Sequence, residues 1–132
     1  MAYLLDTNVA IHLRDGDAAI ADKIAALDDA ILLSVVTRVE LEGGVHRHPV
    51  DAVVRRARLD VLLAAIPSVA FDDEAADVCG AIVAHAGYSR RKLLERMIAA
   101  QAIVLRAMLV TMNPDDFTDI PGLNVRAWPN SP

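Results

Sequence analysis

The chain has 132 residues, which is enough for one domain with a single hydrophobic core. A hydrophobic fraction of 55% and a charged fraction of 23% exclude a disordered chain, and the single cysteine, Cys79, excludes an internal disulfide. The net charge of -5 argues against a passive nucleic-acid-binding module, but it does not exclude an enzyme whose acidic site binds metal cations.

Neither a leader peptide nor a membrane-spanning segment is predicted. The apolar run at the N-terminus has no charged leader and is broken by Asp6. The longest later apolar stretch, residues 97–110, contains Gln101 and Arg106. Together with the lone cysteine, these features lead us to expect a soluble, cytoplasmic protein with one domain over residues 1–132 and no membrane partner.

The first third of the chain alternates between apolar runs and helical patterns. Residues 2–5 read as a buried strand that ends in a polar turn, and residues 8–13 begin a helix. Asp17 is placed as the N-cap of a second helix over residues 18–27. Residues 30–36 form the next strand-like run.

A helix over residues 38–46 is expected next. Thr37 is a candidate N-cap, and Glu40 follows at the spacing of a capping box. Pro49 begins another helix, with an apolar face that extends to Leu63.

The second half continues the alternation. Strands are predicted at residues 68–71 and 108–111, and helices at residues 74–85 and 91–106. Residues 124–127 are a candidate fifth strand. The pattern indicates an α/β fold with a mainly parallel central sheet of four to five strands flanked by helices.

Four acidic residues fall where such a sheet binds ligands. Asp6 ends the first strand, and Asp116 follows the fourth strand by a few residues. Glu40 lies in the first two turns of the helix after the second strand, and Glu95 lies near the start of the helix before the fourth strand. We expect these four side chains to meet beyond the carboxyl ends of the strands.

A cluster of this kind favours a hard divalent cation. Two close carboxylates repel each other by about 4 kcal/mol at an effective dielectric constant of about 20. Oxygen-only sites suit Mg²⁺ or Mn²⁺, and such ions activate water for attack on a phosphodiester. The chemistry therefore points to a metal-dependent nuclease.

Each acid also has a plainer structural interpretation. Asp6 is placed to cap the first helix, and Glu40 could be only the second half of a capping box. Glu95 has arginine neighbours and could be an ordinary solvated helix residue. Asp115 and Asp116 follow a proline and could form a turn. The hypothesis therefore depends on the whole set.

Several segments together resemble the PIN-domain family, especially the VapC-type toxins of bacterial toxin–antitoxin pairs. The similar segments are residues 3–8 (YLLDTN), 33–41 (LSVVTRVEL), 97–102 (MIAAQA) and 109–113 (LVTMN), followed by Asp116-Phe117, Pro121-Gly122-Leu123 and Trp128. They occur in the family's order and cover almost the whole chain.

The resemblance implies a Mg²⁺- or Mn²⁺-dependent endoribonuclease that forms homodimers and is neutralised by a VapB-type antitoxin. Its expected substrate is RNA, with transfer RNA slightly favoured. The resemblance also implies that Asp6 and Glu40 are catalytic metal-site acids. The family motifs add a set of polar residues expected to orient the acids, namely Thr7, Asn8, Ser34 and Asn113.

The chain departs from the family pattern at Glu95, where the family normally has aspartate. Glutamate keeps the charge but extends the side chain by about 1.5 Å. This change could shift the ion, slow the reaction or be absorbed by a rotamer change. For the fourth site residue, the candidates are Asp115, Asp116 and Asn113. Asp116 is preferred because it precedes Phe117, as in relatives.

Basic residues next to Glu95 are the candidate contacts for RNA phosphates, namely Arg90, Arg91, Lys92 and Arg96. A second basic cluster contains Arg55, Arg56 and Arg58, and a solvated helix face is the alternative for both. Parts of the apolar faces of residues 17–27 and 49–63 could form the antitoxin groove.

Two other functions compete with this interpretation. A phosphotransfer receiver domain also places an aspartate at a strand end, but it requires a lysine after a late strand, and neither Lys23 nor Lys92 fits. The remaining alternative is a protein of the same fold that binds an antitoxin but is catalytically weakened by Glu95.

Overall fold

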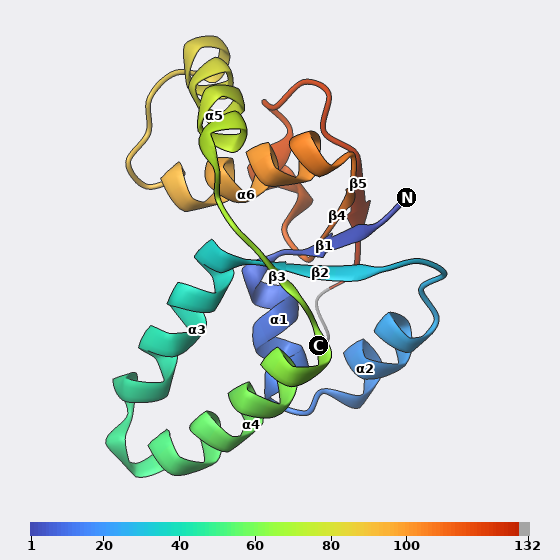
Figure 1. The fold of residues 1–132 in the computed structure, drawn as a ribbon, viewed down its shortest axis with the longest axis vertical. Helices are drawn as coiled ribbons and strands as arrows, with labels where there is room; N and C mark the ends of the chain where they lie inside the picture. Colours follow the sequence, from blue (N-terminus) through green and yellow to red (C-terminus); the bar gives the residue numbers. More distant parts are fainter. Residues whose placement is uncertain (130–132) are drawn as a thin grey trace.

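A computed structural model describes residues 1–129 of the chain (Figure 1). The elements follow in the order β1 (Tyr3–Leu5), α1 (Thr7–Arg14), α2 (Ala18–Ala25), β2 (Ile31–Ser34), α3 (Val35–Arg47), η1 (Pro49–Asp51), α4 (Ala52–Ala65), β3 (Ser68–Val69), α5 (Asp73–Ala86), α6 (Leu93–Leu105), β4 (Met108–Thr111), η2 (Pro114–Phe117) and β5 (Val125–Ala127). The five strands form one parallel sheet in the order β3-β2-β1-β4-β5. The predicted α/β class and the candidate fifth strand are confirmed.

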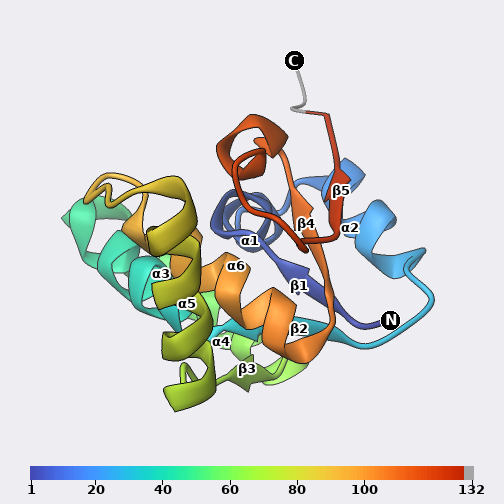
Figure 2. The same cartoon turned by 90° about the horizontal axis from the view of Figure 1, so that it is seen from above.

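Helices cover both faces of the sheet (Figures 1 and 2). α5 and α6 lie on one face, and α1 to α4 lie on the other. The side chains of β1 alternate between two hydrophobic cores, because successive residues of a strand point to opposite faces. Tyr3 and Leu5 join the core beneath α1 to α4, whereas Leu4 joins the core beneath α5 and α6.

Two helix starts follow from local side-chain chemistry. Oδ1 of Asp17 accepts hydrogen bonds from the backbone N–H groups of Ala19 and Ile20, so Asp17 caps α2 as predicted. Asp72 caps α5 in the same way. That helix ends at Gly87, whose φ of 89° lies in a region that favours glycine.

The predicted capping box at Thr37 is wrong. β2 ends at Ser34, and the Ser34 hydroxyl accepts a 3.0 Å hydrogen bond from the N–H of Val36, so α3 begins three residues earlier than expected. The buried Thr37 hydroxyl makes a tertiary hydrogen bond instead. Glu40 therefore lies in the second turn of α3.

The chain order of the strands reverses at the centre of the sheet. β1 pairs with β2 on one side and with β4 on the other. The connection from β1 to β2 runs through α1 and α2, and the connection from β3 to β4 runs through α5 and α6 on the opposite face. This arrangement opens a crevice beyond the carboxyl ends of β1 and β4, where open α/β sheets bind ligands.

No helix within residues 1–129 has both the length and the apolar character needed to cross a bilayer.

Candidate active site

A pocket with a volume of about 700 Å³ lies at this reversal point. All four predicted acids line it, and each comes from a different element. Asp6 follows β1, Glu40 belongs to α3, Glu95 to α6 and Asp116 to η2. The fold therefore brings together residues that are up to 110 positions apart in the sequence (116 − 6).

Asp6 is the most rigidly held of the four acids. Its Oδ1 accepts a 2.9 Å hydrogen bond from the backbone N–H of Thr7, and its Oδ2 accepts a 2.7 Å bond from the hydroxyl of Thr111. Its own N–H donates to the carbonyl of Val110 on β4. Asp6 thus caps α1, as its plainer interpretation required, and also presents a fixed carboxylate to the pocket.

Two of the acids, Asp6 and Glu95, have raised pKa values. Burial raises the pKa of Asp6, and the negative charges of Glu40 and Asp116 add to this, while the bonds from Thr111 and Thr7 oppose it. Burial likewise raises the pKa of Glu95, with further contributions from Asp116 and Asp6. These shifts indicate that the carboxylates share one electrostatic environment, which a cation would relieve.

Glu40 is oriented by a chain of two threonine hydroxyls. The hydroxyl of Thr7 donates to Oε1 of Glu40 at 2.9 Å, and it also lies 2.9 Å from the hydroxyl of Thr37. Because a hydroxyl has only one proton, Thr37 must donate to Thr7 when Thr7 donates to Glu40. The predicted orienting role of Thr7 therefore has a geometric basis, whereas Thr37 was missed.

Thr111 was also missed, although it connects two parts of the site. Besides donating to Asp6, its hydroxyl accepts a 2.9 Å hydrogen bond from the N–H of Asn113. The carbonyl of Asn113 then accepts a bond from the N–H of Asp116. A threonine at the carboxyl end of a central strand was the available sequence signal. Asn113 lines the pocket, as does the exposed Asn8.

Ser34 does not orient the acids as predicted. Its buried hydroxyl donates to Oε1 of Gln101 and accepts from Val36, and neither partner is an acid of the pocket. The amide nitrogen of Gln101 in turn donates to the carbonyls of Val69 and Ala70. Ser34 and Gln101 therefore connect α3, α6 and the segment after β3.

The predicted phosphate contacts separate into different groups. Arg91 lines the pocket, while Arg90 is exposed outside its lining and Lys92 lies 4.0 Å from Asp119. For Arg96 the prediction is wrong, because its side chain is only 4% exposed and donates to the carbonyl of Gly87 and to Asp119. The remaining basic side chains of the pocket, which the sequence prediction did not select, are Arg14, Arg47, His48 and Arg55.

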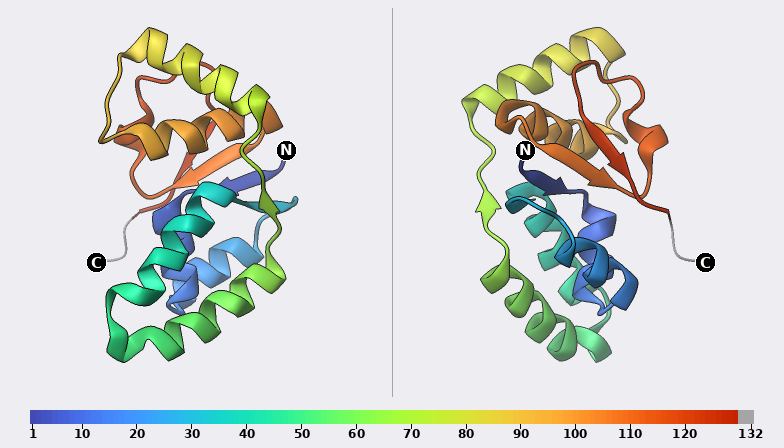
Figure 3. Two further views of the ribbon diagram at one scale, coloured as in Figure 1. Left: turned by 60° about the vertical axis from the view of Figure 1, so that its left-hand side comes forward. Right: turned by 90° about the vertical axis from the view of Figure 1, so that its right-hand side faces the viewer.

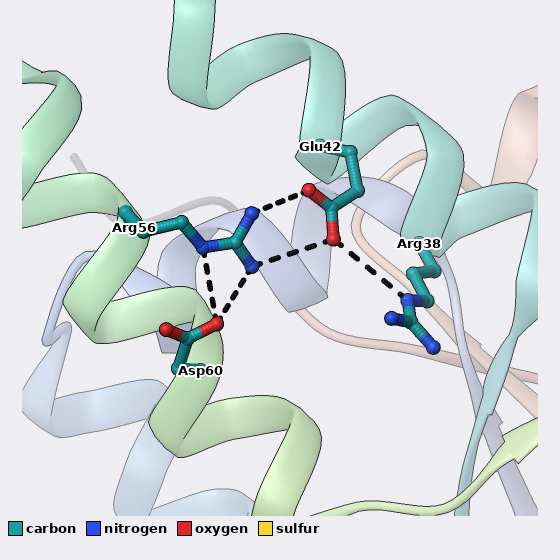
Figure 4. A network of polar contacts seen from close by, with 4 residues as sticks. All are labelled: Arg38, Glu42, Arg56 and Asp60. Atoms are coloured by element: carbon teal, nitrogen blue, oxygen red, sulfur yellow. Dashed lines mark hydrogen bonds and ion pairs between the residues drawn. The ribbon is translucent and has the colours of Figure 1, made fainter.

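An ion-pair network connects α3 and α4, which form one wall of the pocket (Figure 4). Arg56 of α4 pairs with Glu42 of α3 and with Asp60 one turn along its own helix, and Arg38 lies 3.8 Å from Glu42. Figure 3 shows that α3 and α4 meet beyond the sheet at a turn. The network holds the two helices together outside that turn.

The acids fit a divalent metal chemically, since all four offer hard oxygen ligands. Within residues 1–129, however, no three carboxylate, imidazole or thiol side chains lie close enough to hold an ion as they stand. Asp6 is fixed, whereas Glu40 is exposed and Glu95 is partly exposed. Metal binding would therefore require some of the four acidic side chains to move closer together.

Comparison with known proteins places this geometry in context. The family model described as PIN domain matches residues 3–123. The chain is similar to a chain in VapBC2 from Rickettsia felis bound to a promoter DNA fragment, with 24% identity, coverage of 97% and 99% of the two chains and a TM-score of 0.86. It is also similar to a chain in VapBC-1 from nontypeable Haemophilus influenzae, with 23% identity, coverage of 97% of this chain and 98% of that chain, and a TM-score of 0.79. A third similar structure is VapBC-5 from Mycobacterium tuberculosis, a member of the VapBC family of toxin–antitoxin systems. The identity is 27%, the coverage is 98% of each chain and the TM-score is 0.70. No functionally curated protein gives a significant match.

Proposed function

Because this chain belongs to the PIN-domain family, we propose that it is a Mg²⁺- or Mn²⁺-dependent endoribonuclease and the toxin of a VapBC-type pair. The observation that supports this function best is the pocket at the reversal of strand order, which four carboxylates from four different elements line. Arginines line the same pocket, so it offers ligands both for cations and for the phosphates of a nucleic acid.

Asp6, Glu40, Glu95 and Asp116 would hold the metal. When bound, the metal would neutralise these acids, activate a water molecule and stabilise the charge on the phosphodiester. The protein contributes orientation. Thr7 and Thr111 hold both oxygens of Asp6 in place, and the hydroxyl of Thr7 directs one oxygen of Glu40. Arg91, which lines the pocket together with Glu95, would bind a phosphate of the substrate.

RNA is the proposed substrate, with transfer RNA slightly favoured. The aromatic fraction is 4%, which leaves few rings for base stacking. Recognition would then depend on RNA shape and phosphate positions.

A VapB-type antitoxin is the proposed partner, and a homodimer is the proposed assembly. Several similar solved structures are described as VapBC or toxin–antitoxin complexes, some of them bound to DNA. An apolar hollow of about 360 Å³ lies between the end of α1 and α4, lined by residues that include Leu13, Val61 and Ile66. It offers a site for an apolar segment of such a partner.

A catalytically weakened protein is the second candidate. Glu95 stands where the family normally has aspartate, and the acids are not grouped for metal binding as they stand. In that case the chain would bind its antitoxin and cleave RNA slowly or not at all.

The test is RNA cleavage by the purified chain with Mg²⁺, with Mn²⁺ and with a chelator, followed by sequencing of the RNA ends. We expect cleavage that needs the metal and disappears in Asp6→Asn. Cleavage that survives Asp6→Asn would contradict the proposed mechanism. If Glu95→Asp cleaves RNA and the wild-type chain does not, the second candidate is correct.

A further inference from the structure

Arg14, the last residue of α1, is a buried cation that the proposed chemistry of the acids does not use. Its side chain is only 5% exposed. Nε donates to Oδ1 of Asp15 at 3.0 Å, but within residues 1–129 Nη1 and Nη2 donate no hydrogen bond. Arg14 lines the same pocket as the acids. A buried guanidinium that lines a pocket, and whose terminal amino groups have no partner among the described residues, is suited to binding an anion.

Gly44 provides the space that this guanidinium occupies. A Cβ at position 44 would lie 3.3 Å from Nη1 of Arg14, which is closer than ordinary contact. Glycine destabilises the interior of a helix relative to alanine. At position 44, however, the missing side chain leaves room for the guanidinium of Arg14. The carbonyl of Gly44 also accepts a 2.9 Å hydrogen bond from Nη1 of Arg55. Two guanidiniums therefore approach the same glycine, and both line the pocket.

Arg14 and Gly44 lie at a distance from the four acids along two helices. On α1, Arg14 is eight residues beyond Asp6, which corresponds to about 12 Å of helix. On α3, Gly44 follows Glu40 by one turn, or about 6 Å. A nucleic-acid strand that places one phosphodiester at the acids would extend along this pocket, with another phosphate near Arg14 and Arg55.

A purely structural role explains only part of these observations. A cation at the end of α1 interacts favourably with the helix dipole, and Arg14 also pairs with Asp15. Neither effect requires the guanidinium to line the pocket or requires a glycine beside it. The position of Arg14 and Arg55 on the pocket wall, away from the four acids along α1 and α3, instead matches a strand whose cleaved phosphate meets metal ions and whose neighbouring phosphate meets arginine.

We propose that Arg14, seated against Gly44 and assisted by Arg55, binds a backbone phosphate of the substrate strand beside the phosphodiester that is cleaved. This inference rests on the proposed function, because it assumes that the acids define the point of cleavage. Arg14 is a substrate-binding residue in this scheme and takes no part in proton transfer.

The test measures binding without cleavage. A short, fluorescein-labelled single-stranded RNA of mixed sequence is titrated with the full chain in chelator, and anisotropy is followed over a range of salt concentrations. We expect Arg14→Gln to weaken binding about tenfold and to reduce the slope of log affinity against log salt by about 0.7, as for one lost phosphate contact. Arg14→Lys should restore part of the affinity and part of the salt slope.

Gly44→Ala provides a second variant that keeps the guanidinium but displaces it by a few tenths of an ångström. It should weaken binding in the same direction as Arg14→Gln. Gly80→Ala is the matched control, because Gly80 lies inside α5 with nothing within 4 Å of a new Cβ and does not line the pocket. Circular dichroism and thermal melting establish that each variant is folded. If Arg14→Gln fails to fold, Gly44→Ala still decides the matter.

Wild-type affinity and salt slope in both folded variants would overturn the inference. If the wild-type chain cleaves RNA and Arg14→Gln binds normally, only this inference fails. If the chain binds RNA through Arg14 but never cleaves it, only the proposed function fails. If the wild-type chain does not bind RNA at all, both are contradicted.

Discussion

The hydroxyl of Thr7 donates a 2.9 Å hydrogen bond to Oε1 of Glu40 and thereby joins the first residue of α1 to the second turn of α3. Thr7 also supplies the N–H that holds Asp6, so one residue orients two of the pocket acids. The two helices consequently share an orienting residue at the point where the sheet opens.

Replacing Thr7 by valine removes the donor to Glu40 while keeping the shape of the side chain. We expect cleavage to fall about tenfold to 100-fold, the usual effect of losing a group that orients a metal ligand. The free energy of unfolding should fall by about 1 kcal/mol, because one hydrogen bond is lost. Thr37→Val is the matched control, because it leaves the bond from Thr7 to Glu40 intact. Equal loss of cleavage in both variants would contradict the orienting role of Thr7.

The raised pKa values of Asp6 and Glu95 predict how stability depends on pH in the absence of metal. Below the pKa values of the unfolded chain, about 4, both groups are protonated in both states and impose no penalty. As pH rises through the folded pKa values, burying the ionised groups lowers the stability. Asp6→Asn removes one of these penalties, so its advantage over wild type should grow with pH. Urea denaturation in chelator from pH 4 upward measures the difference in unfolding free energy between Asp6→Asn and wild type. If the advantage of Asp6→Asn became smaller with rising pH, a raised pKa of Asp6 would be contradicted.

Shortening Glu95 to aspartate tests whether side-chain length limits the site. Because a misplacement of about 1 Å can cost on the order of 100-fold in rate, we expect Glu95→Asp to increase cleavage by up to about 100-fold. The comparison is made by single-turnover cleavage at saturating Mg²⁺. Glu95→Gln, which keeps the length and removes the charge, should abolish cleavage. Slower cleavage by Glu95→Asp than by wild type would mean that the pocket is built for the longer acid.

Arg91 and Arg96 should behave in opposite ways although they lie close together in the sequence. Arg96 is buried and tied to Gly87 and Asp119, so Arg96→Gln should destabilise the chain by about 2 kcal/mol and leave the salt dependence of RNA binding unchanged. Arg91 is exposed and lines the pocket, so Arg91→Gln should reduce binding and its salt slope with little change in stability. Urea denaturation and anisotropy distinguish the two, and a loss of salt slope in Arg96→Gln would contradict this assignment.

The sequence predicted the α/β class, the strands and the place where the acids meet, because apolar runs and helix caps are local signals. Asp6 was located by the abrupt end of its strand, and Asp17 by its capping position. The partners of these acids were harder to predict. Thr37 and Thr111 reach the site only through tertiary contacts. The strand-end position of Thr111 was its one local signal, and Thr37 had no signal for this role.

The basic residues show the same limit. Arg96 was selected because it neighbours Glu95 in the sequence, but residues one apart on a helix point in different directions. The structure places Arg96 inside the protein and brings Arg14, Arg47 and Arg55 to the pocket from other helices. The Ser34 cap was missed because the apolar residues Val35 and Val36 extend the strand-like pattern into the helix.

The most direct test of a metal site organised by Asp6 is a calorimetric titration of the full chain with Mn²⁺, run in parallel on wild type and Asp6→Asn. If Asp6 anchors the metal, wild type binds Mn²⁺, and Asp6→Asn loses that binding while remaining folded. Absence of binding to wild type, or equal binding to both proteins, would contradict a metal site built on Asp6.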